Sequence, residues 1–375
     1  MMKVTKSEPY LSTYLHTQGR KKGLPIAGNF ELTGRCNFNC PMCYVHLTQE
    51  QLASGGKQEL TAAQWLDLAR QARDRGLIFA LITGGEPLIR KDFFEIYEGM
   101  KDMGLLISIN SNGSMLRGEI LERFLKNPPY RFNISLYGGS EQTYSRMCGL
   151  AMYDKVKENI RALRKAGIQV SLNLSVTPDN CEDLERIYRD AVELDVNVKA
   201  AFYMFPPIRI NGQVYGSARR LTAEEAARYS MRWDELRFPP EELALRLERI
   251  ARMAAVDNEG CPMEEGEGVL CRAGSTSFWL TWDGKMLPCG MMTEPAAYPL
   301  EEGFDAAWAR IREATSRIRT PAQCSGCGKR EVCGMCPSVC YGETGRFDGV
   351  PEYLCHKAEE MIRLAEEKLR ERMQK

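Results

Sequence analysis

The sequence predicts an α/β fold with a parallel sheet, followed by a small region rich in cysteine. Two observations support this prediction. Between residue 28 and about residue 205, short apolar segments rich in β-branched residues alternate with segments of helical periodicity. From residue 261 to residue 355 the composition changes to Gly, Pro and Cys with little periodicity, which is typical of a fold held by metal. Serial βα units with right-handed crossovers form either a partial barrel or an open, doubly wound sheet.

Six segments have the length and composition of buried strands, and we expect strands at 30–33, 77–83, 105–110, 131–136, 169–176 and 196–205. Between the first two, Thr61 and Gln64 form a capping-box pattern that predicts a helix start. The apolar residues that follow, Trp65, Leu68 and Ala72, share one face of that helix.

The second half of the chain begins with two further segments of helical pattern. A capping box at Thr222 and Glu225 opens one predicted helix, and Pro239-Pro240 separates it from another that runs to about residue 257. A charged helix with one apolar side closes the chain and is expected to dock on the rest. The predicted division is an N-terminal extension (1–26), the barrel (27–220), a helical linker (221–260), a cysteine-rich domain (261–357) and the C-terminal helix (358–375).

Composition restricts the possible functions. Fifty basic residues balance fifty acidic ones with no long basic stripe, so we expect no nucleic-acid partner. No window holds eighteen consecutive apolar residues and the start lacks a signal-peptide core, so we expect no membrane span and a cytoplasmic location. With fourteen cysteines and three histidines, any metal chemistry rests mainly on sulfur, which favours iron-sulfur clusters or zinc.

The most informative motif is a group of three cysteines, Cys36, Cys40 and Cys43, directly after the first predicted strand. Three thiolates on one tight loop can hold a 4Fe-4S cube by three corners and leave the fourth iron open to a small chelating ligand. Zinc is the competing reading, but it requires a fourth ligand, and the nearest candidate, His46, would have to close a cramped loop. Three buried thiols without a metal are a weaker alternative.

The second predicted strand ends in Thr83-Gly84-Gly85-Glu86-Pro87. A C-x3-C-x2-C loop after strand one combined with Gly-Gly-Glu-Pro after strand two resembles the radical S-adenosylmethionine (SAM) enzymes. The resemblance implies a partial (β/α)6 TIM-like barrel and a 4Fe-4S cluster on Cys36, Cys40 and Cys43 that SAM chelates. It also implies SAM contacts at Gly84, Gly85 and Glu86, where glycines permit close backbone approach and a carboxylate can meet an ammonium group.

The same resemblance assigns further SAM contacts at the ends of the third and fourth strands and just beyond them. These candidates are Ser108, Asn110, Asn112, Ser135 and Arg146. Two positions depart from the usual family pattern. Met42 stands where an aromatic residue commonly precedes the third cysteine, and Tyr137 replaces a common aspartate.

The C-terminal cysteines are similar to the SPASM domain, an extension of some radical SAM enzymes that carries two auxiliary 4Fe-4S clusters. The resemblance assigns Cys324, Cys327, Cys333 and Cys355 to one cluster. It assigns Cys261, Cys271, Cys289 and either Cys336 or Cys340 to the other. The alternative is a zinc ribbon at Cys324, Cys327, Cys333 and Cys336. Cys148 and Cys181 remain as ordinary thiols.

The resemblance implies reductive cleavage of SAM to a 5'-deoxyadenosyl radical, which abstracts hydrogen from a substrate held in a closed cavity. The leading hypothesis is a peptide or protein maturase that forms a crosslink or oxidises a side chain, served by a flavodoxin- or ferredoxin-type electron donor. Two alternatives are a small-molecule radical SAM enzyme of cofactor biosynthesis and a non-catalytic iron-sulfur or zinc protein.

Overall fold

The computed structural model describes residues 7–48, 51, 58–209, 216, 219–255 and 266–374. Its centre is a curved sheet of six parallel strands, β1 (Ala27–Glu31), β2 (Phe79–Thr83), β3 (Leu106–Ser111), β4 (Arg131–Ser135), β5 (Val170–Ser175) and β6 (Asn197–Ala201). The predicted α/β fold and its partial barrel are confirmed. The ends of the strands shift by a few residues, and the strand expected at 196–205 is the shorter Asn197–Ala201.

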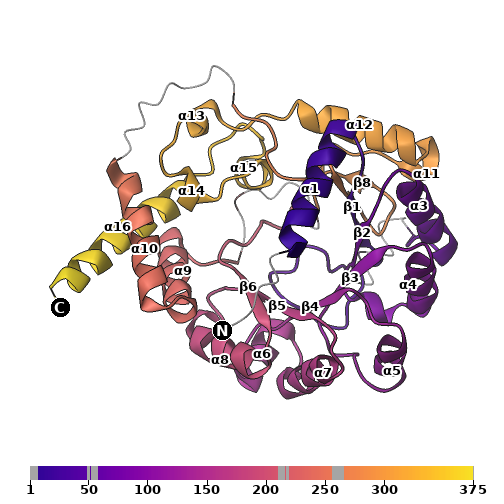
Figure 1. Cartoon of the computed structure of the whole chain (residues 1–375), viewed down its shortest axis with the longest axis horizontal. Helices are drawn as coiled ribbons and strands as arrows, with labels where there is room; N and C mark the ends of the chain where they lie inside the picture. The colour runs from indigo at the N-terminus through magenta and orange to yellow at the C-terminus, as the bar shows by residue number, and fades with distance from the viewer. Residues whose placement is uncertain are drawn as a thin grey trace.

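Helices α3 to α8 cover the outside of this arc (Figure 1). They are α3 (Ala62–Asp74), α4 (Phe93–Asp102), α5 (Gly118–Lys126), α6 (Glu141–Cys148), α7 (Tyr153–Lys165) and α8 (Leu184–Glu193). Short 3-10 turns η1 (Pro87–Ile89) and η2 (Cys181–Asp183) precede α4 and α8. The capping box predicted at Thr61 and Gln64 is present, with both reciprocal hydrogen bonds made.

The sheet continues beyond the six predicted strands. Its order is β6-β5-β4-β3-β2-β1-β7-β8, in which β7 (Ser277–Leu280) is parallel to β1 and β8 (Met286–Leu287) is antiparallel to β7. Gly28 lies opposite Phe278, and a Cβ at Gly28 would come within 2.4 Å of the Phe278 ring. The sequence analysis predicted neither strand, since β7 is only four residues long and lies in a region of the sequence rich in Gly, Pro and Cys.

The remaining helices frame the sheet. Helix α1 (Ser7–Lys22) precedes β1, while α9 (Ala223–Arg237), α10 (Pro240–Ala251) and the turn η3 (Arg252–Ala255) follow β6. The cysteine-rich region contains α11 (Pro299–Glu302), α12 (Phe304–Ser316), α13 (Ala322–Ser325), α14 (Arg330–Cys333) and α15 (Pro337–Thr344), before the last helix, α16 (Glu352–Met373). Among the described residues, no helix combines the length and apolar character needed to cross a membrane.

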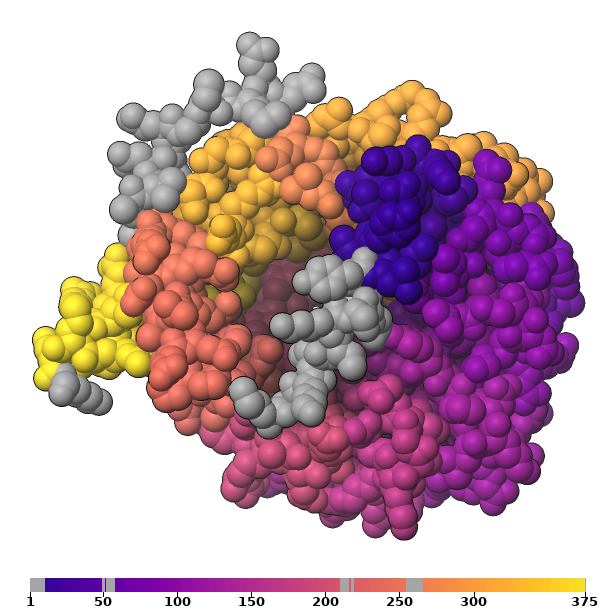
Figure 2. Space-filling view, viewed as in Figure 1, coloured from indigo at the N-terminus to yellow at the C-terminus, as the bar shows by residue number. Residues whose placement is uncertain are grey.

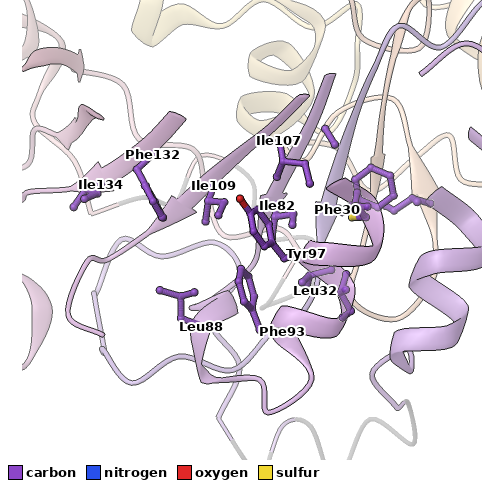
Figure 3. Close-up of a cluster of buried hydrophobic side chains, with 14 of the residues drawn as sticks. Phe30, Leu32, Ile82, Leu88, Phe93, Tyr97, Ile107, Ile109, Phe132 and Ile134 are labelled. Atoms are coloured by element: carbon purple, nitrogen blue, oxygen red, sulfur yellow. The ribbon is translucent and has the colours of Figure 1, made fainter. Parts of the chain in front are cut away.

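The main core lies between the outer face of the sheet and its helices. Figure 3 shows Phe30, Ile82, Ile107 and Ile109 from neighbouring strands meeting Phe93 and other side chains of the covering helix. These side chains alternate with residues that face the barrel interior, as expected for a parallel strand with one face against helices. This packing holds the carboxyl ends of the strands in place.

The same core extends into the cysteine-rich region. Phe278 of β7 is fully buried and makes edge contacts with Phe30, with ring centroids 5.8 Å apart, and with Phe304 at 5.3 Å. Trp308 of α12 also makes an edge contact with the Phe278 ring, with centroids 6.1 Å apart. The predicted boundary at residue 261 remains a prediction, yet residues on both sides of it share one apolar core.

The C-terminal helix docks as its apolar pattern predicts. Helix α16 packs on α9 and α10, and Met361, Ile362 and Ala365 are buried in that contact. Met373, near the end of the helix, is exposed. Arg220, before α9, also pairs with Glu343 of α15 and stacks on Tyr353 of α16, with the guanidinium carbon 3.9 Å from the ring centroid.

We predict that Phe278→Ala destabilises the whole chain, because it opens a cavity where β1, β7 and α12 meet. Truncation of a buried aromatic side chain costs about 3–5 kcal/mol of the free energy of unfolding. Urea unfolding of the protein under anaerobic conditions measures this cost. Tyr298→Ala, at an exposed aromatic residue of the same region, should change stability by no more than about 0.5 kcal/mol. Equal effects of the two variants would contradict the shared core.

Candidate functional site

The candidate site forms where the loops after β1 and β2 run side by side. Beyond the strands, Leu32 donates its backbone N–H to Thr83 O at 2.9 Å. Gly85 donates to Thr33 O at 2.8 Å, and Glu86 donates to Arg35 O at 2.9 Å. The loop that carries the three cysteines is therefore hydrogen-bonded along its start to the Gly-Gly-Glu-Pro segment.

The two glycines are required for this contact. A Cβ at Gly84 would lie 2.6 Å from Thr33 O, and Gly84 has a φ of +143°, which other residues rarely adopt. A Cβ at Gly85 would lie 2.1 Å from Arg35 O and 3.1 Å from the Cβ of Cys36. Any larger residue at either position would push the cysteine loop away.

The three thiols of the loop lie partly exposed at this junction. Backbone amides point at two of the sulfurs, since Phe38 N–H lies 3.3 Å from Cys36 Sγ and His46 N–H lies 3.3 Å from Cys43 Sγ. Burial raises the pKa of Cys36 to about 12 and also raises the pKa of Cys43. These thiols stay protonated at neutral pH unless a metal cation replaces the proton, which is how thiolate ligands form.

The donor set fits an iron-sulfur cluster. Three sulfurs on one loop, with amide donors directed at them, supply the ligands and hydrogen bonds that such clusters use. Among the residues that the structure describes, no three His, Cys, Asp or Glu side chains converge tightly enough for a single metal ion. A cube makes a different demand, because each thiolate binds its own iron.

Cys40 has a neighbour that the sequence analysis left as an ordinary thiol. Cys148, the last residue of α6, is buried, and its side chain hydrogen-bonds to Cys40. This contact, followed by burial, raises the pKa of Cys40. Asn39 N–H also donates to Cys148 O at 3.0 Å, so the end of α6 anchors the middle of the cysteine loop.

Glu86 is fully buried, and its carboxylate already has several partners. It accepts hydrogen bonds from Leu88 N–H at 3.1 Å, Asn112 N–H at 2.7 Å and Ser111 Oγ at 3.0 Å. Burial raises the pKa of Glu86 to about 7, although these hydrogen bonds oppose the shift. In this arrangement Glu86 ties the end of β3 to the glycine loop. Its predicted contact with the SAM ammonium group stays a prediction.

Asn112 orients the cysteine loop. Its side-chain N–H group lies 3.8 Å from Cys36 Sγ and donates to Asn37 Oδ1 at 2.8 Å. Asn37 in turn donates to Ser114 Oγ at 3.0 Å, and Ser114 donates back to Asn112 Oδ1 at 2.7 Å. The closed set of hydrogen bonds places Asn112 behind Cys36.

Three other candidates line the barrel interior. Ser108 and Asn110 share the inner face of β3, and Ser135 lies at the end of β4. Asn110 accepts a hydrogen bond from Asn133 at 2.9 Å and approaches Thr83 Oγ1 at 3.4 Å. Polar side chains thus follow the inner wall towards the cysteine loop.

Arg146 lies apart from this wall. It is exposed on α6 and donates to Asp179 O at 2.8 Å. The structure therefore joins Arg146 to the loop after β5, and its predicted contact with SAM stays a prediction.

The sequence analysis did not include two residues of the barrel interior among the candidate site residues. Tyr137, noted only as a departure from a family pattern, hydrogen-bonds to Ser135 and lies close to Cys40, and burial raises its pKa. Asn133 was hidden because it stands within an apolar strand, between Phe132 and Ile134. Strict alternation along β4 is the signal that could have identified it.

An ion pair crosses the interior between the cysteine loop and the C-terminal region. Arg209 pairs with the buried Glu31 at 2.7 Å and donates to Gly290 O at 3.0 Å. Trp279 of β7 donates its indole N–H to the same carboxylate at 2.8 Å. The Arg209 guanidinium also lies 5.9 Å from the Tyr44 ring centroid. These contacts link β1 to the segment after β6 and to the cysteine-rich region.

The C-terminal cysteines form two groups. Cys324, Cys327, Cys333 and Cys355 line one cavity of about 420 Å³. Cys271, Cys289 and Cys336 form the other group. Burial is the main cause that raises the pKa values of Cys289 and Cys336, and the neighbouring Cys271 raises both further. Cys261 lies outside the described residues.

Cys340 differs from Cys336 in its surroundings. Its side chain is fully buried in α15, where burial and then Cys324 raise its pKa to about 12. Cys336, one turn earlier, is partly accessible and lies beside Ser338 and Cys271. Of the two residues that the spacing left open, Cys336 is the one grouped with Cys271 and Cys289.

Comparisons of sequence agree with this site. Residues 30–191 match the family model described as the radical SAM superfamily. The chain is 26% identical over 331 residues to the AdoMet-dependent heme synthase of Methanosarcina barkeri, covering 85% of this chain and 93% of that protein. It is also 26% identical over 328 residues to the PqqA peptide cyclase of Streptomyces rochei, covering 84% and 82% of the two chains.

Solved structures share the fold. Streptococcus suis SuiB bound to its precursor peptide SuiA matches 94% of this chain and 82% of its own, with a TM-score of 0.64 and 17% identity. The enzyme anSMEcpe with bound AdoMet matches 92% and 98%, with a TM-score of 0.68 and 14% identity. The likeness covers the barrel and the cysteine-rich region together.

The raised pKa of Glu86 predicts a pH dependence. Between about pH 4.5 and pH 7 the folded state keeps this proton while the unfolded chain has released it, so stability falls as pH rises through that window. Glu86→Gln removes the titration. We expect the difference in unfolding free energy, wild type minus variant, to decrease from pH 4.5 to pH 7.5 in urea titrations of the cluster-free protein. A difference that stays constant or grows would contradict the assignment.

Proposed function

This chain is a radical SAM enzyme, and we propose that it is a maturase that abstracts hydrogen from a peptide or protein substrate and leaves a crosslink or an oxidised side chain. The observation that carries the radical chemistry is the contact of the three-cysteine loop with Gly84 and Gly85. It brings three potential cluster ligands and a glycine-lined backbone to the same end of the barrel.

In this proposal Cys36, Cys40 and Cys43 hold a 4Fe-4S cluster that leaves one iron open for SAM. When bound and reduced, this cluster supplies the electron that cleaves SAM to a 5'-deoxyadenosyl radical. The chain's own contribution is position and enclosure. The amides of Phe38 and His46 point at the ligand sulfurs, and hydrogen bonds to cluster sulfurs affect the reduction potential.

The SAM molecule would lie along the polar inner wall. Gly84 and Gly85 allow close approach to their backbone, while Ser108, Asn110 and Ser135 present hydroxyl and amide groups from neighbouring strands. Glu86 and Asn112 would act indirectly, because they hold the glycine loop and Cys36 in position.

Two auxiliary 4Fe-4S clusters belong to the proposal, as in a SPASM domain. Cys324, Cys327, Cys333 and Cys355 would hold one of them in the cavity of about 420 Å³ that they line. Cys271, Cys289 and Cys336 would hold the other, with Cys261 as the fourth ligand. The cysteine content of each group matches what a fully ligated cube requires.

A peptide or protein substrate is supported by the comparisons with proteins of similar architecture. The names of three of them refer to peptides: the PqqA peptide cyclase, SuiB with its precursor peptide SuiA, and anSMEcpe with a bound peptide. A flavodoxin- or ferredoxin-type donor and a cytoplasmic location complete the proposal.

A small-molecule substrate is the second candidate. It is favoured by the heme synthase relative from Methanosarcina barkeri, because that match covers 93% of the relative's length. Under this alternative the same cluster and SAM site would act on a cofactor precursor.

The cluster assignment predicts that Cys40→Ala abolishes 5'-deoxyadenosine formation from SAM under dithionite, because one of three ligands is lost. Liquid chromatography of anaerobic reactions measures this product. Cys181→Ala, at a thiol buried between α8 and α9, is the matched control and should retain production. Full activity of the Cys40 variant would refute the assignment of the radical cluster.

Metal analysis tests the same assignment and the number of clusters. Three cubes contain about twelve irons and as many sulfides per chain. A reconstituted sample that holds zinc in place of iron would overturn the proposal. Activity with a candidate peptide, read as a mass loss of two hydrogens, would separate the maturase from the small-molecule alternative.

The grouping of the C-terminal thiols predicts different outcomes at two neighbouring cysteines. Cys336→Ser should lose about one cluster, or four irons, because Cys336 faces Cys271 and Cys289. Cys340→Ser should keep the full iron content, since the Cys340 side chain on α15 is fully buried and lies outside the group of Cys271 and Cys289. Iron and sulfide assays after reconstitution compare the two variants. The reverse order of losses would show that Cys340 is the ligand.

A further inference from the structure

The described part of the chain contains a cavity at the amino-terminal end of the strands, and of its lining residues only Cys271 and Cys289 belong to the proposed cluster and SAM sites. Its volume is about 790 Å³, and it lies between α1, the start of the cysteine-rich region and strand β7. Figure 2 shows the surface hollowed beside α1. Cys271 and Cys289 lie on its wall together with Trp279.

The charged side chains that line this cavity, which we call the basal cavity, are all cationic. Arg20, Lys21 and Arg272 line it, and no Asp or Glu is among its lining residues. Arg20 donates to the backbone oxygen of Cys271 at 2.8 Å, and Arg272 approaches Ser12 Oγ at 3.4 Å. Neither contact supplies a negative charge. Within the described residues, none of the three cations forms an ion pair.

A buried histidine adds an unpartnered polar atom to the same wall. His16 is 7% exposed, and its Nδ1 lies 2.8 Å from Thr276 Oγ1. Its Nε2 has no hydrogen-bond partner among the described residues. Burial, and then Arg272 and Arg20, lower the pKa of His16 to about 4, so the ring is neutral at pH 7. When Thr276 donates to Nδ1, Nε2 carries the proton and serves as a donor.

The barrel interior also carries cationic side chains. Lys199 of β6 and Arg131 of β4 start from the strand faces that point into the barrel. Burial and then Arg131 lower the pKa of Lys199. The buried Nε of Arg131 also lacks a partner among the described residues. The interior carboxylate of Glu31 is already taken by Arg209 and Trp279.

We propose that the basal cavity is a carboxylate-binding site, in which His16, Arg20, Lys21 and Arg272 hold an acidic group of the substrate at the end of the barrel opposite the three-cysteine loop. Unpaired cations around a cavity favour an anionic ligand, and guanidinium groups bind carboxylates through charge-assisted hydrogen bonds. The inference rests on the proposed function and narrows its substrate to one that carries carboxylates.

The carboxylates could belong to an acidic peptide or to a small polycarboxylic acid. Two pairs of probes separate these sources: tetraglutamate with tetraglutamine, and tricarballylate with its triamide. Calorimetric titration of the fully reconstituted wild-type enzyme should show binding of an acid and much weaker binding of its amide. Tighter binding of tetraglutamate indicates a peptide source, and tighter binding of tricarballylate indicates a small molecule. An amide that binds as tightly as its acid would overturn the proposal.

The variant Lys21→Gln/Arg272→Gln tests the residues. We expect about a tenfold weaker affinity for the acidic probe, because two charged contacts are removed. Lys22→Gln is the matched control, since Lys22 is the next residue of α1 and does not line the cavity. Its affinity should change less than about twofold. Equal weakening by both variants would reveal a general surface field and refute a built site.

The cations could instead balance the thiolates of Cys271 and Cys289. In that case the double variant would lose iron from the auxiliary cluster. The molecules of the variant that still hold this cluster would then bind the acidic probe as tightly as the wild type does, and this result would overturn the proposal. Production of 5'-deoxyadenosine by the wild-type enzyme tests the radical chemistry separately. Failure of that assay and failure of acid selectivity are therefore distinguishable.

Discussion

The close contact between two loops at one end of the barrel is the constraint on which the rest of the structure depends. Thr33 and Arg35 accept hydrogen bonds from the backbone of Gly85 and Glu86, and no side chain at positions 84 or 85 could fit between the two loops. Strand pairing of β1 with β2 sets the register of this contact. The position of the three cysteines follows from it, because their loop starts where the hydrogen bonds end.

Burial gives each polar group near this contact a definite role. The carboxylate of Glu86 is satisfied by groups at the end of β3 and the start of η1, and Asn112 is satisfied by Asn37 and Ser114. An unsatisfied buried polar group would be costly, so the two loops and β3 hold each other in place. Residues that a family resemblance assigns to SAM thus also serve as supports for the cysteine loop. The C-terminal region stays close to this site because β7 extends the same sheet and Phe278 enters the same core.

Much of the fold could be predicted because its signals are local. Six βα units, two capping boxes and the apolar side of the last helix can each be recognised within a short window, and the structure contains all of them. The strands β7 and β8 could not be predicted, because four residues beside glycines and cysteines carry no distinct period. They form since β1 has an open edge whose backbone groups require partners. Tyr137 and Asn133 were passed over for a related reason, because their importance depends on which strand face turns inward.

The sequence by itself determined the chemistry that this protein can perform, because three cysteines in eight residues followed by Gly-Gly-Glu-Pro restrict both ligands and backbone conformation. Only the tertiary structure decided how the distant residues combine. It grouped Cys336 with Cys271 and Cys289, buried the side chain of Cys340, and gathered three cations, from α1 and residue 272, around one cavity. The physical reason is that spacing along the chain records local geometry, whereas burial and charge balance arise from neighbours that lie far apart along the chain.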